Sequence, residues 1–411
     1  MSKLLPEDFV LDDPQLTREV TLEDILSHRT GISRHDDSYL SIRAKNPDNA
    51  KSMTRNLRNL PFANPLRTTF VYSNIMYTVA SYLVERTSRT PYAEFLRKNL
   101  WNPLSMAETF HDLPDLEAHN AMTRKATPYR LDKKDKTNHI SIPTYEQPEG
   151  QGAGSIYSTA GDYAKYIRAL MKRAAPLSYS SHKELVTPRT LCPQEDKFKI
   201  PRSGPELYSL GLEQTEYRGY TIISHDGGVA GFTAKIAFIP AFQQGLVMFA
   251  NMDGSYWGIL ALFYTWVDEV IGVPKEERTD WLAFFRKWEE RKEAESDDDD
   301  PELAKPENPK PLGVPLDAIA GTFHDAGYKS VVLYMEDDKL MADCNDRSFP
   351  FVLTFEYLTG NRFKVHLYQV WDDEWDKLKG EIRVEGDKVV ALGIGFDTDV
   401  PGGLIWFHRV A

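Results

Sequence analysis

The amino-acid sequence predicts an α+β domain, in which helices cover an antiparallel sheet, followed by a small all-β barrel. Three observations carry this prediction: helix and strand patterns are mixed in the first part of the chain, an acidic and proline-rich stretch follows, and closely spaced strand patterns fill the end. The 411 residues are 41% hydrophobic, enough to build sizeable cores. We therefore predict a domain over residues 1–285, a linker over 286–315 and a barrel over 316–411.

Four segments of the first domain have helical patterns. Thr21 and Asp24 have the spacing of a capping box, which opens a helix. Residues 74–87 place apolar side chains at helical spacing, and residues 159–171 repeat this pattern. The nearly apolar run 256–267 is short of the roughly 20 residues that a bilayer crossing needs, so it predicts a core helix and no membrane span.

Two strand patterns in the same domain lie close together. Residues 233–239 and 245–251 flank the short connection 240–244 and are expected to pair as a hairpin. This hairpin supplies part of the antiparallel sheet that the helices cover.

The linker is predicted from its composition. Residues 286–315 begin rich in lysine and glutamate, pass through Asp297–Asp300 and end with several prolines. Such a stretch cannot bury a core and is typical of a charged, solvated spacer.

The last part of the chain alternates short strand patterns with turn residues such as Thr359-Gly360-Asn361 and Glu385-Gly386-Asp387. The predicted strands are residues 330–335, 340–344, 351–358, 362–370, 380–384, 389–396 and 404–410. So many short strands imply a small antiparallel barrel or sandwich. Its interior either is filled by its own aromatic side chains or holds a ligand.

Charge and composition exclude several classes of partner. The 49 basic and 61 acidic residues give a net charge of −12, which disfavours nucleic acid and an anionic membrane surface as partners. The histidines and the two distant cysteines form no local metal-binding motif, so the sequence predicts no metal and no cofactor. The absence of a signal sequence in the chain as given and of a disulfide pattern favours a cytoplasmic location.

Four segments, taken in order, resemble serine β-lactamases of class C and their relatives. Residues 20–31 (VTLEDILSHRTG) resemble a segment between the two halves of the active site, and Tyr72-Ser73-Asn74 resembles the family's Tyr-x-Asn element. The glycine loop 152–162 resembles the one that enters a family helix, and His225-Asp226-Gly227 resembles the strand-borne Lys/His-x-Gly element. An isolated His-Asp-Gly would more often be a hairpin turn, and an isolated Tyr72 a packed core residue.

The resemblance implies a helix-covered sheet of the β-lactamase/transpeptidase type and assigns candidate site residues. Tyr72 would be the acid–base group, but a phenol with a pKa near 10 needs neighbouring cations to act as a base. Asn74 would donate to a substrate amide or carbonyl, and His225 would steady the tyrosinate or bind a substrate carboxylate. Gly227 would let the substrate backbone approach, and the N–H of Gly228 would be an oxyanion donor.

The family's nucleophile is expected to be absent from this chain. Family members attack with the serine of a Ser-x-x-Lys helix that precedes the segment matched here by residues 20–31, and only twenty residues precede that segment. Ser180-Ser181-His182-Lys183 has the pattern but lies after Tyr72 in a polar stretch, so we do not expect Ser180 to be the nucleophile. The first domain is therefore predicted to be an incomplete β-lactamase-like domain.

The C-terminal strands resemble the lipocalin-like domain attached to some family members, through residues 319–324 and Gly327-Tyr328. Together the resemblances imply a serine hydrolase or acyltransferase that acts on a small-molecule ester or amide through an acyl-enzyme. Two alternatives stay open: a non-catalytic scaffold that retains the cleft, and a small-molecule carrier that acts through the barrel. A homo-oligomer also stays open, and fold does not choose the substrate.

Overall fold

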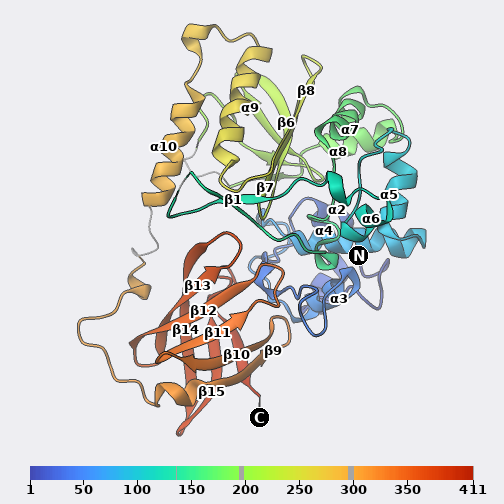
Figure 1. The fold of residues 1–411 in the computed structure, drawn as a ribbon. Helices are drawn as coiled ribbons and strands as arrows, with labels where there is room; N and C mark the ends of the chain where they lie inside the picture. The colour runs from blue at the N-terminus through green and yellow to red at the C-terminus, as the bar shows by residue number, and fades with distance from the viewer. Residues whose placement is uncertain (136, 194–198, 295–299, 411) are drawn as a thin grey trace.

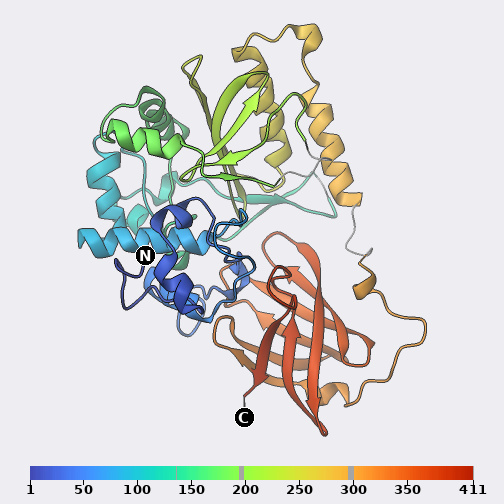
Figure 2. The same cartoon turned by 180° about the vertical axis from the view of Figure 1, so that it is seen from behind.

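The structure, a computed structural model, describes residues 1–135, 137–193, 199–294 and 300–410. A helix-covered sheet lies beside a closed β-barrel, as Figures 1 and 2 show from opposite sides. The predicted order of an α+β domain followed by an all-β barrel is confirmed.

The described residues of the first part form the four helices that the sequence predicts and six more. They are α1 (Pro14–Glu19), α2 (Leu22–Leu26), α3 (Ala50–Asn56), α4 (Asn74–Ser88), α5 (Tyr92–Leu96), α6 (Leu113–Ala118), α7 (Ala160–Lys172), α8 (Tyr179–Val186), α9 (Tyr256–Val270) and α10 (Trp281–Ala294). The capping box is present at α2, where Thr21 accepts from the backbone of Asp24 and the Asp24 carboxylate accepts in return. None of the helices in the described part of the chain is long and apolar enough to cross a bilayer.

The main sheet has six strands in the order β3 (Thr190–Leu191), β4 (Leu207–Tyr208), β5 (Glu213–Tyr217), β6 (Tyr220–Val229), β7 (Phe232–Ile239) and β8 (Gln244–Ala250). The predicted hairpin is the antiparallel pair β7–β8. Alternate residues of a strand face opposite sides of a sheet. In β7, Ala237 and Ile239 pack with α9 and α10, whereas Ile236 and Phe238 pack with α7. Both faces of the sheet are therefore covered by helices (Figure 1).

A short hairpin of β1 (Tyr129–Leu131) and β2 (His139–Ser141) runs between the main sheet and the barrel (Figure 1). The sequence did not predict it, because its strands are three residues each and mostly polar. Arg130 forms an ion pair with Asp373 of the barrel at 3.0 Å. The hairpin is thus fastened by contacts from distant parts of the chain.

The barrel is closed, and each strand is antiparallel to its neighbours. It consists of β9 (Gly321–Asp325), β10 (Lys329–Glu336), β11 (Lys339–Cys344), β12 (Phe351–Thr359), β13 (Arg362–Gln369), β14 (Glu374–Glu385), β15 (Lys388–Ile394) and β16 (Ile405–Arg409), and β16 closes on β9. Large side chains from its strands are buried, among them Phe323, Phe351, Phe363 and Phe407. This filling argues against the alternative of a carrier that holds a small molecule in the barrel.

The segment predicted as a linker begins with helical structure, because α10 runs through residue 294. The apolar side chains Trp281, Phe285 and Trp288 hold this helix against α9, and a pattern of charges alone hid that packing. Most of the acidic run, Asp297–Asp299, lies outside the described residues. From residue 300 the chain leads to the barrel through two short 3₁₀ turns, Pro301–Leu303 and Leu316–Ile319.

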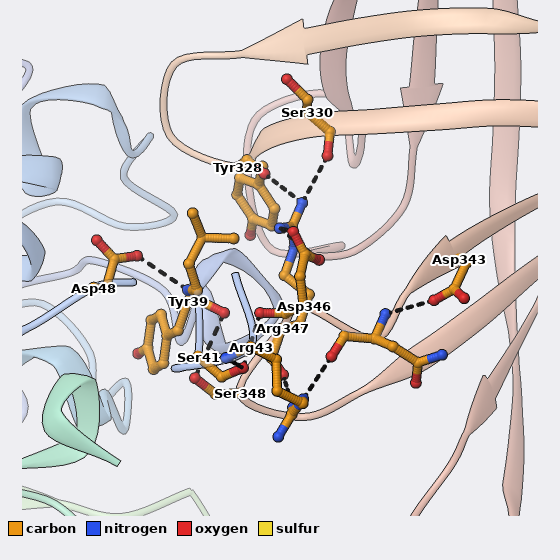
Figure 3. Close-up of polar contacts among 12 residues, drawn as sticks. Tyr39, Ser41, Arg43, Asp48, Tyr328, Ser330, Asp343, Asp346, Arg347 and Ser348 are labelled. Atoms are coloured by element: carbon orange, nitrogen blue, oxygen red, sulfur yellow. Dashed lines mark hydrogen bonds and ion pairs between the residues drawn. The ribbon is translucent and has the colours of Figure 1, made fainter. Parts of the chain in front are cut away.

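One end of the barrel is joined to the first sixty residues of the chain. Apolar side chains of both parts form one buried cluster, which includes Met53 and Leu57 on one side and Phe323 and Phe351 on the other. Figure 3 shows the polar part of the contact, where the Ser41 hydroxyl donates to the carbonyl oxygen of Asp346 at 3.0 Å and Nε of Arg43 donates to that of Asn345 at 2.7 Å. The two parts therefore share a core.

Candidate active site

Tyr72 and Asn74 lie at the beginning of α4. This helix forms because Ile75, Val79 and Leu83 bury one face of it. Ser73 is the extended residue before the first turn, and its N–H donates to Nδ1 of His28 at 3.1 Å. The Tyr-x-Asn element is thereby fixed to the segment that follows α2.

His225, Gly227 and Gly228 lie within strand β6, in register with Ile236, Ala234 and Thr233 of β7. The turn between the two strands comes later, at Ala230 and Gly231. The His-Asp-Gly element is therefore borne on a strand, as the resemblance implied, and is not a hairpin turn.

The structure brings Tyr72 and His225 together although they are 153 positions apart in the sequence. Their ring centroids are 6.5 Å apart. Nδ1 of His225 lies 2.5 Å from the carbonyl oxygen of Asp226, which only accepts, so Nδ1 carries the proton. Nε2 must then accept from the Tyr208 hydroxyl at 3.0 Å. Burial lowers the pKa of His225, so the ring is neutral at pH 7.

This geometry limits what His225 can do. Both ring nitrogens are used within the chain, and a direct bond to a substrate carboxylate requires one of these hydrogen bonds to break. The neutral ring also supplies no positive charge to stabilise a tyrosinate. Tyr208, which orients His225, was not among the residues singled out from the sequence.

His28 is a second residue that sequence reasoning missed. Its ring centroid lies 4.2 Å from that of Tyr72, and Tyr77 and Tyr208 lie at 5.2 and 4.9 Å. Burial lowers its pKa to about 3, so the ring is neutral. Since Nδ1 accepts from Ser73, Nε2 carries the proton, and this buried N–H has no hydrogen-bond partner among the described residues. The available signal was its place inside the family-like segment 20–31.

The Tyr72 hydroxyl has no hydrogen-bond partner in the part of the chain that the structure describes. Burial raises the pKa of Tyr72, and the guanidinium of Arg34, 5.5 Å from the ring centroid, offsets this only in part. The phenol is therefore protonated at pH 7 and available to a ligand.

The Asn74 amide is already hydrogen-bonded within the chain, and the space beside the two glycines differs. The Asn74 amide donates to Asp36 at 3.2 Å, so its orientation is set inside the chain. A side chain at Gly227 would meet Ala234 at 3.3 Å, whereas one at Gly228 would meet nothing within 4 Å. The open space therefore lies in front of Gly228.

Charged and polar side chains of β7 and α9 bond to Asp226 of β6. Lys235 of β7 pairs with Asp226, and Tyr256 of α9 donates to the same carboxylate at 2.9 Å. Burial lowers the pKa of Lys235, but Asp226 and Glu213 outweigh it and raise the pKa. Together these side chains fix Asp226, whose carbonyl oxygen orients His225.

Two other kinds of site find no support within residues 1–135, 137–193, 199–294 and 300–410. Ser180 is exposed on α8, where its hydroxyl group bonds to that of Ser178 at 2.9 Å. No group of three His, Cys, Asp or Glu side chains there could hold a metal ion.

The helix-covered sheet, the Tyr-x-Asn turn and the strand-borne His-x-Gly define a β-lactamase-like serine hydrolase fold. The sequence matches the family described as Beta-lactamase over residues 1–260, and the chain belongs to this family. An unguisins hydrolase of Aspergillus violaceofuscus is 35% identical over 384 residues, covering 88% of this chain and 67% of the relative. One of Aspergillus campestris is 31% identical, covering 100% of this chain and 76% of the relative.

A solved structure resembles both parts of the chain. The octameric penicillin-binding protein homologue of Pyrococcus abyssi has a TM-score of 0.50 and 19% identity, and the match covers 98% of this chain and 84% of that one. This likeness concerns the fold.

Proposed function

We propose that this chain carries the acid–base and substrate-binding part of a serine hydrolase that acts on a small ester or amide through an acyl-enzyme. The observation that carries the proposal is the meeting of Tyr72 with His225, whose ring centroids are 6.5 Å apart. The Tyr72 hydroxyl has no hydrogen-bond partner among the described residues and is therefore free to bond to a substrate.

Tyr72 would relay one proton during acylation. As a tyrosinate it would take the proton of the attacking serine, and as a phenol it would then pass this proton to the leaving oxygen or nitrogen of the substrate. Because burial raises the pKa of Tyr72, this role requires a cation beside its hydroxyl. Asn74 would hold the substrate amide or carbonyl. The N–H of Gly228, with open space beside it, would stabilise the developing oxyanion.

The nucleophile would come from a Ser-x-x-Lys helix outside the 411 residues. The exposed position of Ser180 supports this, as does the absence of any described serine hydroxyl bonded to Tyr72. A preceding helix would also bring a lysine, and this cation would lower the pKa of Tyr72 and let the phenol act as a base.

The names of the two fungal relatives favour hydrolysis over acyl transfer. We extend this to the present protein and propose a substrate related to unguisins. We also propose that the protein is located in the cytoplasm and that it can form a homo-oligomer.

The test compares the 411-residue chain with a longer form in which a Ser-x-x-Lys helix precedes Met1. The chain alone should turn over p-nitrophenyl esters no faster than a heat-treated control, and fluorophosphonate probes should label no serine. The longer form should gain both signals. In it, Tyr72→Phe should lower kcat by about 10² to 10⁴, the usual share of general acid–base catalysis.

Tyr179→Phe is the matched control, because this tyrosine is 65% exposed on α8 and should leave kcat unchanged. Probe-sensitive turnover by the 411-residue chain would overturn the proposed external nucleophile. A longer form that binds esters but never turns them over would favour the non-catalytic scaffold.

A further inference from the structure

A groove of about 380 Å³ lies between the first part of the chain and the barrel, away from the residues of the candidate active site. Ile142 and Pro143, which follow β2, form one wall. Val370 and Trp371, which follow β13, form the other. These residues come from two parts of the chain, so the groove exists only when the barrel is docked.

Arg43 brings a positive charge to this groove, and the nearby Glu149 and Asp346 balance it only in part, because burial lowers the pKa of its guanidinium. Its Nε donates to the carbonyl oxygen of Asn345 at 2.7 Å, and Nη2 donates to that of Arg347. Figure 3 shows this side chain reaching the barrel loop. Its remaining nitrogen, Nη1, is buried without a hydrogen-bond partner among the described residues, and no carboxylate there lies within ion-pair distance of it. A buried guanidinium nitrogen without a hydrogen-bond partner raises the free energy of the folded chain, and a hydrogen bond to an anion would remove this cost.

The aromatic side chains around Arg43 form a flat, apolar surface. The rings of Tyr145 and Trp371 stack with centroids 5.5 Å apart, and the Arg43 guanidinium lies 4.6 and 5.0 Å from them. The Tyr145 hydroxyl has no hydrogen bond in the described part of the chain. Arg43 and both rings line the groove, so a ligand that packs against the rings lies next to the guanidinium. Arg130, the other cation at the groove, is neutralised by Asp373.

We propose that this groove binds a carboxylate that carries an aromatic or branched aliphatic group. The carboxylate bonds to Nη1 of Arg43, and the apolar group packs against Ile142, Val370 and the Tyr145–Trp371 pair. Charge-assisted bonds to a guanidinium are the strong class of hydrogen bond, and the apolar walls match the body of such a ligand. A free carboxylic acid and the C-terminus of a peptide share this chemistry.

The experiment measures binding to the full 411-residue chain by titration calorimetry. The probes are N-acetylphenylalanine and Ala-Ala-Ala-Phe, each compared with its C-terminal amide. We expect at least one acid to bind with a Kd at or below about 1 mM and its amide to bind at least about tenfold more weakly. Binding of the peptide acid identifies a peptide terminus as a ligand, and binding of N-acetylphenylalanine alone identifies free acids.

Variants then locate the binding. Ser141 lines the groove and its side chain makes no hydrogen bond among the described residues, so Ser141→Trp should fill the groove and weaken binding at least about tenfold. Ser141→Ala should bind within about twofold of the wild-type chain. Arg43→Gln should remove the preference for acid over amide, whereas Arg124→Gln, at a surface ion pair with Glu108, should retain it.

Thermal unfolding confirms that each variant is folded. If Arg43→Gln does not fold, the binding measured with Ser141→Trp shows whether the ligand occupies the groove. The proposal is overturned if neither acid binds at about 10 mM, if acid and amide bind equally, or if Ser141→Trp binds like the wild-type chain.

Discussion

The contact between the barrel and the first sixty residues differs from the candidate site at Tyr72 and His225 in how its polar groups are used. At the contact, the Ser41 hydroxyl donates to the carbonyl oxygen of Asp346 at 3.0 Å, and the Tyr328 hydroxyl lies 2.8 Å from Nδ1 of His35. At the candidate site, the Tyr72 hydroxyl and Nε2 of His28 have no partner among the described residues. Buried polar groups that are hydrogen-bonded hold parts of a fold together. Polar groups without a partner raise the free energy of the fold, and a ligand that bonds to them can offset this.

The largest effect that this comparison predicts is at Arg347. Replacement by alanine leaves the carbonyl oxygens of Tyr328 and Ser330, at the end of the barrel that meets the first sixty residues, without their donor. Arg347→Ala should lower the free energy of unfolding by about 3 kcal/mol or more, measured by urea denaturation. Arg124→Ala, at an exposed ion pair, should cost less than about 1 kcal/mol. Equal effects would show that the hydrogen bonds of Arg347 contribute no more than a surface ion pair.

The next effect depends on pH and concerns Glu149, which accepts from Ser348 across the contact. Burial raises its pKa to about 7 from 4.5. The folded chain then holds the proton more tightly than the unfolded chain, so this contribution to stability is complete below pH 4.5 and is lost as the pH rises through 7. Relative to Glu149→Gln, the wild-type chain should lose up to about 1.4 kcal/mol per pH unit in this window. Parallel stability curves for the two proteins would contradict the buried acid.

The smallest effect comes from a matched pair of tyrosines. Tyr328→Phe removes a buried hydrogen bond to His35 and should cost about 1 kcal/mol. Tyr72→Phe removes a hydroxyl without a partner and should change the free energy of unfolding by less than about 0.5 kcal/mol. A large loss at Tyr72 would mean that its hydroxyl is structural, and would weaken its assignment to the acid–base role.

The barrel was the easier part to predict, because its strands are joined mostly by short local turns. The turn residues at Gly360 and Gly386 mark two hairpins in the sequence and in the structure. The β1–β2 hairpin could not be predicted in this way, since Asp373 fastens it from 243 residues away. Helix α10 was hidden by its charges, and only the packing of Trp281 and Phe285 reveals it.

The candidate site depended on resemblance, since Tyr72 and His225 are weak signals when each is taken alone. The resemblance placed both residues at one cleft but did not give their protonation states. His28 and Tyr208 define those states through hydrogen bonds and burial, which appear only when α4, β4 and β6 are assembled. Burial raises the pKa of Tyr72 more than Arg34 lowers it, so a base role for Tyr72 requires a further cation.

The hydrogen bond between His35 and Tyr328 joins residues 293 positions apart. A ribosome that adds about 5 to 20 residues per second needs roughly 15 to 60 s to make the intervening chain. During that time Met53, Leu57 and Leu60 have no barrel to pack against, although they are fully buried in the finished protein. The first sixty residues therefore complete their fold last, and chaperones that shield apolar segments have a defined interval in which to act on this protein.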